Sequence, residues 1–69
     1  MSLTYKQRVE LALESSRSLS EVDEVEKAVE RTQYINRRTK AGRKLTQELL
    51  ELCRQKALDL IEKDNIQPF

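Results

Sequence analysis

The feature that most constrains the fold of this 69-residue chain is a broad apolar stripe in the segment 45–63, LTQELLELCRQKALDLIEK. At about 100° per residue, most of its apolar side chains fall within an arc of roughly 120°. They are Leu49, Leu50, Cys53, Ala57, Leu60 and Ile61. Because so wide an apolar face needs more than one neighbour to cover it, the segment is predicted to be the central helix of a small bundle.

The composition favours helices over strands. Glycine and proline each occur once, 36% of the residues are charged, and no segment shows the alternation with period two that indicates a strand. The sequence therefore predicts an all-α fold in a single domain, 1–69. We expect a small three-helix arrangement dominated by an antiparallel helical hairpin, with helices at about 5–17, 21–41 and 47–63.

The expected helix ends come from residues that cap helices. Thr4, Ser20 and Thr46 each follow a leucine and precede a charged or amide-rich turn, which is typical of helix starts. Thr4 is expected to form a capping box with Gln7. Gly42, the only glycine, is expected to end the second helix in the left-handed conformation.

Helical periodicity also predicts which faces of the first two helices are buried. In the first helix the buried face is Tyr5, Val9, Ala12, Leu13 and Ser16, and Leu11 points away from it. In the second helix the apolar face is Val22, Val25, Ala28, Val29 and Ile35. This face becomes polar towards its C-terminal end, at Thr32, Asn36 and Thr39.

So small a chain has little apolar material for a core. A core in a chain below about 70–80 residues rarely supplies more than about 3–5 kcal/mol, and the single cysteine, Cys53, allows no internal disulfide. We expect Cys53 to be a buried thiol on the apolar stripe. Burial against a protein partner or a second copy of the chain is the remaining source of stability, and a dimer is favoured.

Four leucines lie at the margins of the predicted faces and form a candidate partner surface: Leu11, Leu45, Leu52 and Leu58. They support the function that we expect, a non-catalytic protein–protein interaction module such as a small adaptor, regulator or chaperone-like subunit. Such a module would dock through apolar helix faces.

Enzymes, metal proteins and membrane proteins are disfavoured. The chain has no histidine and no glycine-rich phosphate-binding motif, so neither the commonest general base nor an ordinary zinc site is available. We expect no cofactor. No apolar run approaches the length of about 20 residues that spans a bilayer, and a cytoplasmic location is expected. The segment 65–69 is expected to be a mobile tail.

A basic cluster leaves a second function open. Five bases occur between Arg37 and Lys44, and Lys27, Arg31, Tyr34 and Arg38 would share one line on a continuous second helix. The structural interpretation is that acids at the start of that helix and bases at its end stabilise the helix dipole. The functional alternative is a nucleic-acid-associated factor that uses Lys27, Arg31, Tyr34, Arg37, Arg38, Lys40, Arg43 and Lys44. A helix-turn-helix is disfavoured because the third helix is rich in leucine and carries acids outside.

Overall fold

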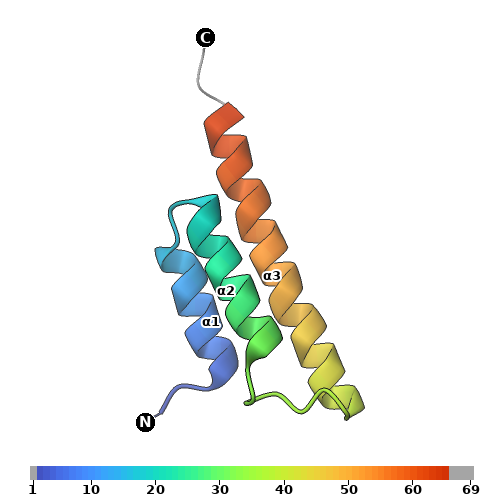
Figure 1. Ribbon diagram of the computed structural model, residues 1–69. Coiled ribbons are helices and arrows are strands. Elements are labelled where there is room, and N and C mark those ends of the chain that lie inside the picture. Colours follow the sequence, from blue (N-terminus) through green and yellow to red (C-terminus); the bar gives the residue numbers. More distant parts are fainter. Residues whose placement is uncertain (1, 66–69) are drawn as a thin grey trace.

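The computed structural model describes residues 2–65, and these form three α-helices without a strand (Figure 1). The helices are α1 (Tyr5–Ser15), α2 (Leu19–Arg31) and α3 (Lys40–Asn65). The predicted all-α, three-helix class is therefore confirmed. The predicted tail begins at the last residue of α3, and residues 66–69 lie outside the described part of the chain.

The start of α1 follows the expected local chemistry. The hydroxyl of Thr4 accepts a hydrogen bond from the backbone N–H of Gln7 at 3.1 Å, and the Gln7 side chain accepts from the N–H of Thr4 at 2.9 Å. This reciprocal pair is a capping box, and it satisfies two N–H groups that a helix start leaves free. At the other end, buried Ser16 donates to the carbonyl of Ala12 at 2.8 Å.

The cap of α2 differs from the prediction. Ser18, not Ser20, is the N-cap residue, and its hydroxyl accepts from the N–H of Glu21 at 3.3 Å. The Glu21 carboxylate in turn accepts from the N–H of Arg17 at 3.0 Å. Glutamate is long enough to reach back over the turn in this way, whereas the predicted Ser20–Asp23 pair lies inside the helix.

The predicted continuation of the second helix to residue 41 is wrong, because α2 ends at Arg31 and Thr32 is already extended. Polar side chains take over the backbone donors of the loop: the N–H of Tyr34 donates to the Thr32 hydroxyl, and the N–H of Arg38 donates to the Asn36 side chain. Such local bonds compete with helix formation. Ile35, in the loop that follows α2, is buried with 7% exposure.

The third helix starts at Lys40, seven residues before the predicted start. Thr39 precedes it, and its hydroxyl accepts from the N–H of Gly42 at 3.0 Å. Gly42 therefore lies in the first turn of α3, and no residue in the described part of the chain has a positive φ. The predicted left-handed C-cap at Gly42 is wrong. Thr46, the expected cap, lies inside α3 and donates to the carbonyl of Gly42.

The core lies between all three helices, and α2 and α3 run antiparallel side by side along its length (Figure 1). Its buried apolar residues are Val9, Leu13, Val22, Val29, Ile35, Leu49 and Cys53. All seven belong to the predicted faces. Leu49, Val29 and Cys53 are completely covered, so the predicted burial of the Cys53 thiol is confirmed.

The helices differ greatly in length. At 1.5 Å per residue, the 26 residues of α3 extend about 39 Å and the 13 residues of α2 extend about 20 Å. The C-terminal turns of α3 consequently project beyond the turn that joins α1 to α2 (Figure 1). Ile61, which the apolar stripe predicted to be covered, remains 40% exposed there.

Candidate binding surfaces

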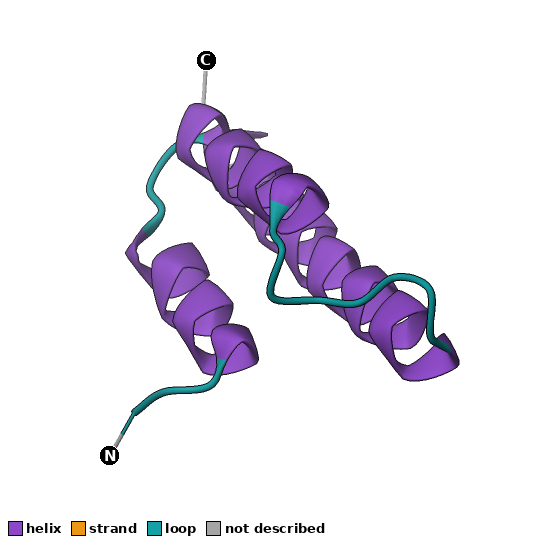
Figure 2. Cartoon of the chain, turned by 60° about the horizontal axis from the view of Figure 1, so that its bottom comes forward, coloured by secondary structure: helices purple, strands orange, loops and turns teal. Residues whose placement is uncertain are grey.

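One candidate surface is the basic end of the molecule, which we define as Arg31, the loop 32–39 and the first turns of α3 up to residue 44. Figure 2 shows this loop running from the end of α2 to the start of α3. The predicted line of Lys27, Arg31, Tyr34 and Arg38 does not form, because α2 ends at Arg31. Lys27 instead pairs with Asp23 at 3.0 Å within α2, and the hydrogen bond that it donates to the Asp23 carboxylate raises the pKa of Lys27.

Arg37 has a structural task in this loop. Its guanidinium donates to the carbonyl of Val29 at 2.5 Å, in the last turn of α2. The last carbonyls of a helix have no partner within the helix, and a cation there also complements the helix dipole. Arg37, which lies eight residues after Val29, therefore caps the C-terminal end of α2.

Three other bases of the cluster lie near a helix N-terminus, where a positive charge opposes the helix dipole. Lys40, Arg43 and Lys44 lie in the first turns of α3, which carry no acid, and each is exposed. A cation at a helix N-terminus opposes the dipole by about 0.3–1 kcal/mol when exposed. The dipole interpretation of the sequence is thus wrong for these three residues, because they belong to the start of α3 and not to the end of α2.

Tyr34 is the most exposed large hydrophobic residue in the described part of the chain, with 78% exposure. Its ring centroid lies 5.6 Å from that of Tyr5 at the start of α1, with the two planes tilted by 31°. This contact joins the loop to α1. It leaves most of the Tyr34 ring open to solvent.

The four leucines of the predicted partner surface do not form one continuous patch. Leu45 and Leu52 are half-buried and pack against the core, whereas Leu11 and Leu58 are 48% and 54% exposed. Leu11 lies in a shallow hollow formed only by α1 and the segment before it. Leu58, nine residues after Leu49, faces about 180° away from that core residue on α3.

A different apolar surface follows one flank of α3, and its residues belong to the apolar stripe that was predicted to be buried. Leu50, Ala57 and Leu60 are only half-buried, and Ile61 is exposed. At about 100° per residue, Leu50, Ala57 and Ile61 lie roughly 80–120° from Leu49, beside the core and not within it. The width of the apolar stripe was the feature of the sequence that could have indicated this exposed surface, since α1 and α2 are too short to cover a stripe of that width.

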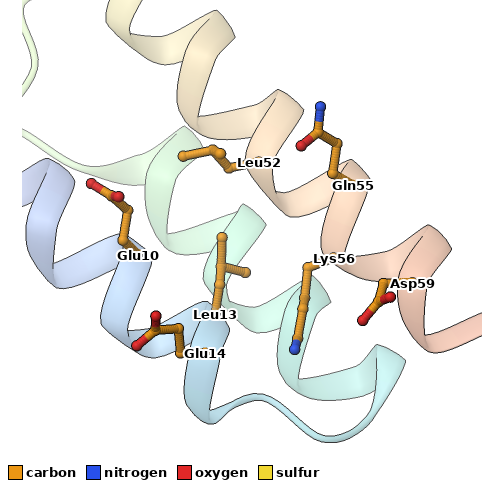
Figure 3. Close-up of a pocket in the computed structure, with 7 residues that line it drawn as sticks. All are labelled: Glu10, Leu13, Glu14, Leu52, Gln55, Lys56 and Asp59. Carbon is orange, nitrogen blue, oxygen red and sulfur yellow. The ribbon is translucent and has the colours of Figure 1, made fainter.

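A groove of about 340 Å³ separates α1 from α3 (Figure 3). Leu13 and Leu52 point into it from opposite helices. Polar side chains surround these two leucines: Glu10, Glu14, Gln55, Lys56 and Asp59. Asp59 also pairs with Lys63 at 3.5 Å. The groove is open to solvent, and its charged lining consists of three acids and one base.

Among the side chains that the structure describes, no group of three or more histidine, cysteine, aspartate or glutamate residues has the arrangement of a metal site. None of the three helices, as far as they are described, combines the length and apolar character needed to cross a membrane.

The fold and these surfaces define a small all-α protein with three helices, a basic end and an apolar flank on its longest helix. No protein-family model, curated protein or solved structure matches the chain. The residues and their geometry therefore carry the functional argument.

Proposed function

We propose that this chain is a non-catalytic protein–protein interaction module and that the exposed flank of α3 is its docking face. The observation that carries the proposal is the 40% exposure of Ile61 on this flank, together with the 54% exposure of Leu58, its neighbour three residues earlier on the helix surface. Both lie on a helix twice as long as the one it packs against. Fully burying one such side chain stabilises an assembly by about 1.5–3 kcal/mol. A protein with so small a core has much to gain from this burial.

The spacing along this flank suits a second helix. Leu50, Arg54, Ala57 and Ile61 follow one another at intervals of four, three and four residues, as in the seam of a pair of helices. Arg54 can lay its aliphatic stem along the seam and keep its guanidinium in water. The occupant that we favour is α3 of a second copy, which would make the protein a dimer.

Sedimentation equilibrium at micromolar concentration, together with thermal unfolding at several concentrations, tests the proposal. We expect a mass above 8.1 kDa and a melting temperature that rises with concentration, because association stabilises the folded state by mass action. A single 8.1 kDa species whose melting temperature does not depend on concentration would contradict self-association.

Two double variants locate the contact. Leu58→Glu with Ile61→Glu adds two charges to the flank and is expected to shift the protein towards the monomer while the helical signal persists. Ser20→Glu with Gln55→Glu adds the same charge at two exposed polar positions and should leave the mass unchanged. Equal loss of association in both variants would assign the effect to net charge and remove the flank from the proposal.

A further inference from the structure

The charges of this chain are distributed unevenly. The segment 31–47 contains six basic residues and no acidic one, whereas the rest of the chain contains seven basic and twelve acidic residues. The net charge of +1 therefore conceals one strongly basic region and a surplus of acids elsewhere.

The fold gathers this region at one end of the molecule. Arg31 ends α2, Arg37 and Arg38 lie in the loop, and the remaining bases lie in the first turns of α3. Arg37 is engaged with the carbonyl of Val29. The other five bases are exposed, and none of them forms an ion pair within the described part of the chain. Arg31 lies on α2, and the remaining four follow one another in the loop and at the start of α3: Arg38, Lys40, Arg43 and Lys44.

The stability of the fold does not explain this arrangement. Lys40 and Lys44 lie four residues apart on α3, a spacing at which like charges repel, and both oppose the dipole at the helix start. Four positive charges held together without acids are suited to a ligand that carries several negative charges at regular intervals, because each contact releases a condensed counterion.

The exposure of Tyr34 favours one class of negatively charged ligand over the others. Its backbone N–H donates to the Thr32 hydroxyl at 3.1 Å, its ring centroid lies 5.6 Å from that of Tyr5, and the residue is nevertheless 78% exposed. Tyr34 lies in the same loop as Arg38, four residues before it. Proteins that bind single strands combine such an open aromatic ring, on which an unpaired base stacks, with cations that neutralise the backbone phosphates.

We propose that the basic end binds single-stranded nucleic acid, with phosphates on Arg38, Lys40, Arg43 and Lys44 and one base stacked on Tyr34. A duplex offers no unpaired base to Tyr34, and an acidic peptide offers no planar ring at each charge. The footprint is short, because Glu48 and Glu51 follow on α3 and repel the strand beyond Lys44. This surface is separate from the flank of α3 proposed as a docking face.

The binding is measured with the full chain by fluorescence anisotropy of labelled twelve-nucleotide probes: oligo-dT, oligo-U and a DNA duplex, each over a series of NaCl concentrations. We expect both single strands to bind more tightly than the duplex. With about four phosphates neutralised, the logarithm of the binding constant should fall with the logarithm of the salt concentration with a slope of about −3.

Three variants test the residues. Lys40→Gln with Lys44→Gln should weaken binding about tenfold or more and reduce the slope by about 1.4. Tyr34→Ala should weaken it about fivefold or more, and Tyr34→Phe should restore it, since phenylalanine also stacks. The matched control is Arg17→Gln with Lys63→Gln, which makes the same change in net charge outside the basic end and should bind like the unchanged protein.

Four results would overturn the proposal. The first is no binding of either single strand at low salt, and the second is equal weakening by the control variant. The third is a duplex that binds as tightly as the single strands, combined with no effect of Tyr34→Ala. The fourth is poly-glutamate that displaces the probe as efficiently, per charge, as unlabelled oligonucleotide does. Circular dichroism of each variant verifies that its helices persist.

Discussion

Gly42 lies in the first turn of α3, where an added Cβ would overlap the carbonyl oxygen of Asn36. That oxygen is held in place because it accepts hydrogen bonds from both the N–H and the hydroxyl of Thr39. A glycine is needed at this position because the backbone of Asn36 leaves no room for a Cβ atom. The reason is not a left-handed backbone conformation, since the φ angle of Gly42 is not positive.

Gly42→Ala should therefore destabilise the protein by about 1–3 kcal/mol through overpacking, even though alanine favours helices by about 1 kcal/mol over glycine. Urea unfolding measures the change. Gly42→Asn separates the two explanations, since asparagine is tolerated at a left-handed cap but would overlap Asn36 as alanine does. An asparagine variant as stable as the unchanged protein would contradict the close approach.

Among the described side chains, Cys53 is the one titratable group completely covered by the core. Burial raises the pKa of its thiol above the ordinary value of 9.0, and the nearby Glu26 carboxylate raises it further. Because the folded-state pKa lies above the unfolded one, the thiol's contribution to stability is fully present below about pH 9 and is lost as the pH rises through the folded-state pKa.

We expect the free energy of unfolding to fall as the pH rises above about 9 and the fall to be smaller in Cys53→Ala. The raised pKa of Lys27 acts in the same direction, so the comparison between the two proteins isolates the thiol. Unfolding by urea at several pH values provides the measurement. Parallel pH profiles for the two proteins would show that the thiol does not contribute.

At the scale of the elements, two serines near the start of α2 have different roles, since Ser18 caps the helix and Ser20 lies inside it. Ser18→Ala removes the hydroxyl that accepts from the N–H of Glu21 and should cost about 0.5–2 kcal/mol. Ser20→Ala, two residues later inside the helix, should be neutral or slightly stabilising, because alanine is the better helix former.

Thermal unfolding followed by circular dichroism compares these two variants under identical conditions. We expect the melting temperature of Ser20→Ala to equal or exceed that of the unchanged protein. The melting temperature of Ser18→Ala should be lower than both. The reverse order would place the start of α2 at Ser20 and contradict the observed cap.

For the whole molecule, the small core makes stability depend on a few residues. Leu49 is completely covered, so Leu49→Ala should cost about 2–5 kcal/mol, which is comparable with the whole stability of a chain of this size. Leu58, at 54% exposure, lies outside the core. Leu58→Ala should change the stability of the isolated chain by no more than about 0.5 kcal/mol.

The helical signal and the mass, recorded over a range of concentrations, separate these effects. Leu49→Ala should lose helix at every concentration, while Leu58→Ala should keep its helices and associate less. If Leu58→Ala unfolded as severely as Leu49→Ala at every concentration, the outer side of α3 would have to be buried within one chain.

Local properties of the sequence were sufficient for the helical class, the capping box at Thr4 and the residues of the core. Each depends on residues within about four positions of one another or on a helical period, both of which can be counted along the chain. The buried thiol of Cys53 was predictable for the same reason, since its place on the apolar stripe of α3 does not depend on the partner helix.

The boundary between α2 and α3 was decided by tertiary contacts. Ile35 is buried in the loop after α2 has ended, and Gly42 is needed because the carbonyl of Asn36 approaches the start of α3. This boundary moved the bases between Lys40 and Lys44 from the end of one helix to the start of the next, which reversed their relation to the helix dipole. Likewise, the apolar stripe of α3 shows which side chains prefer burial, but the lengths of α1 and α2 determine which of them remain exposed.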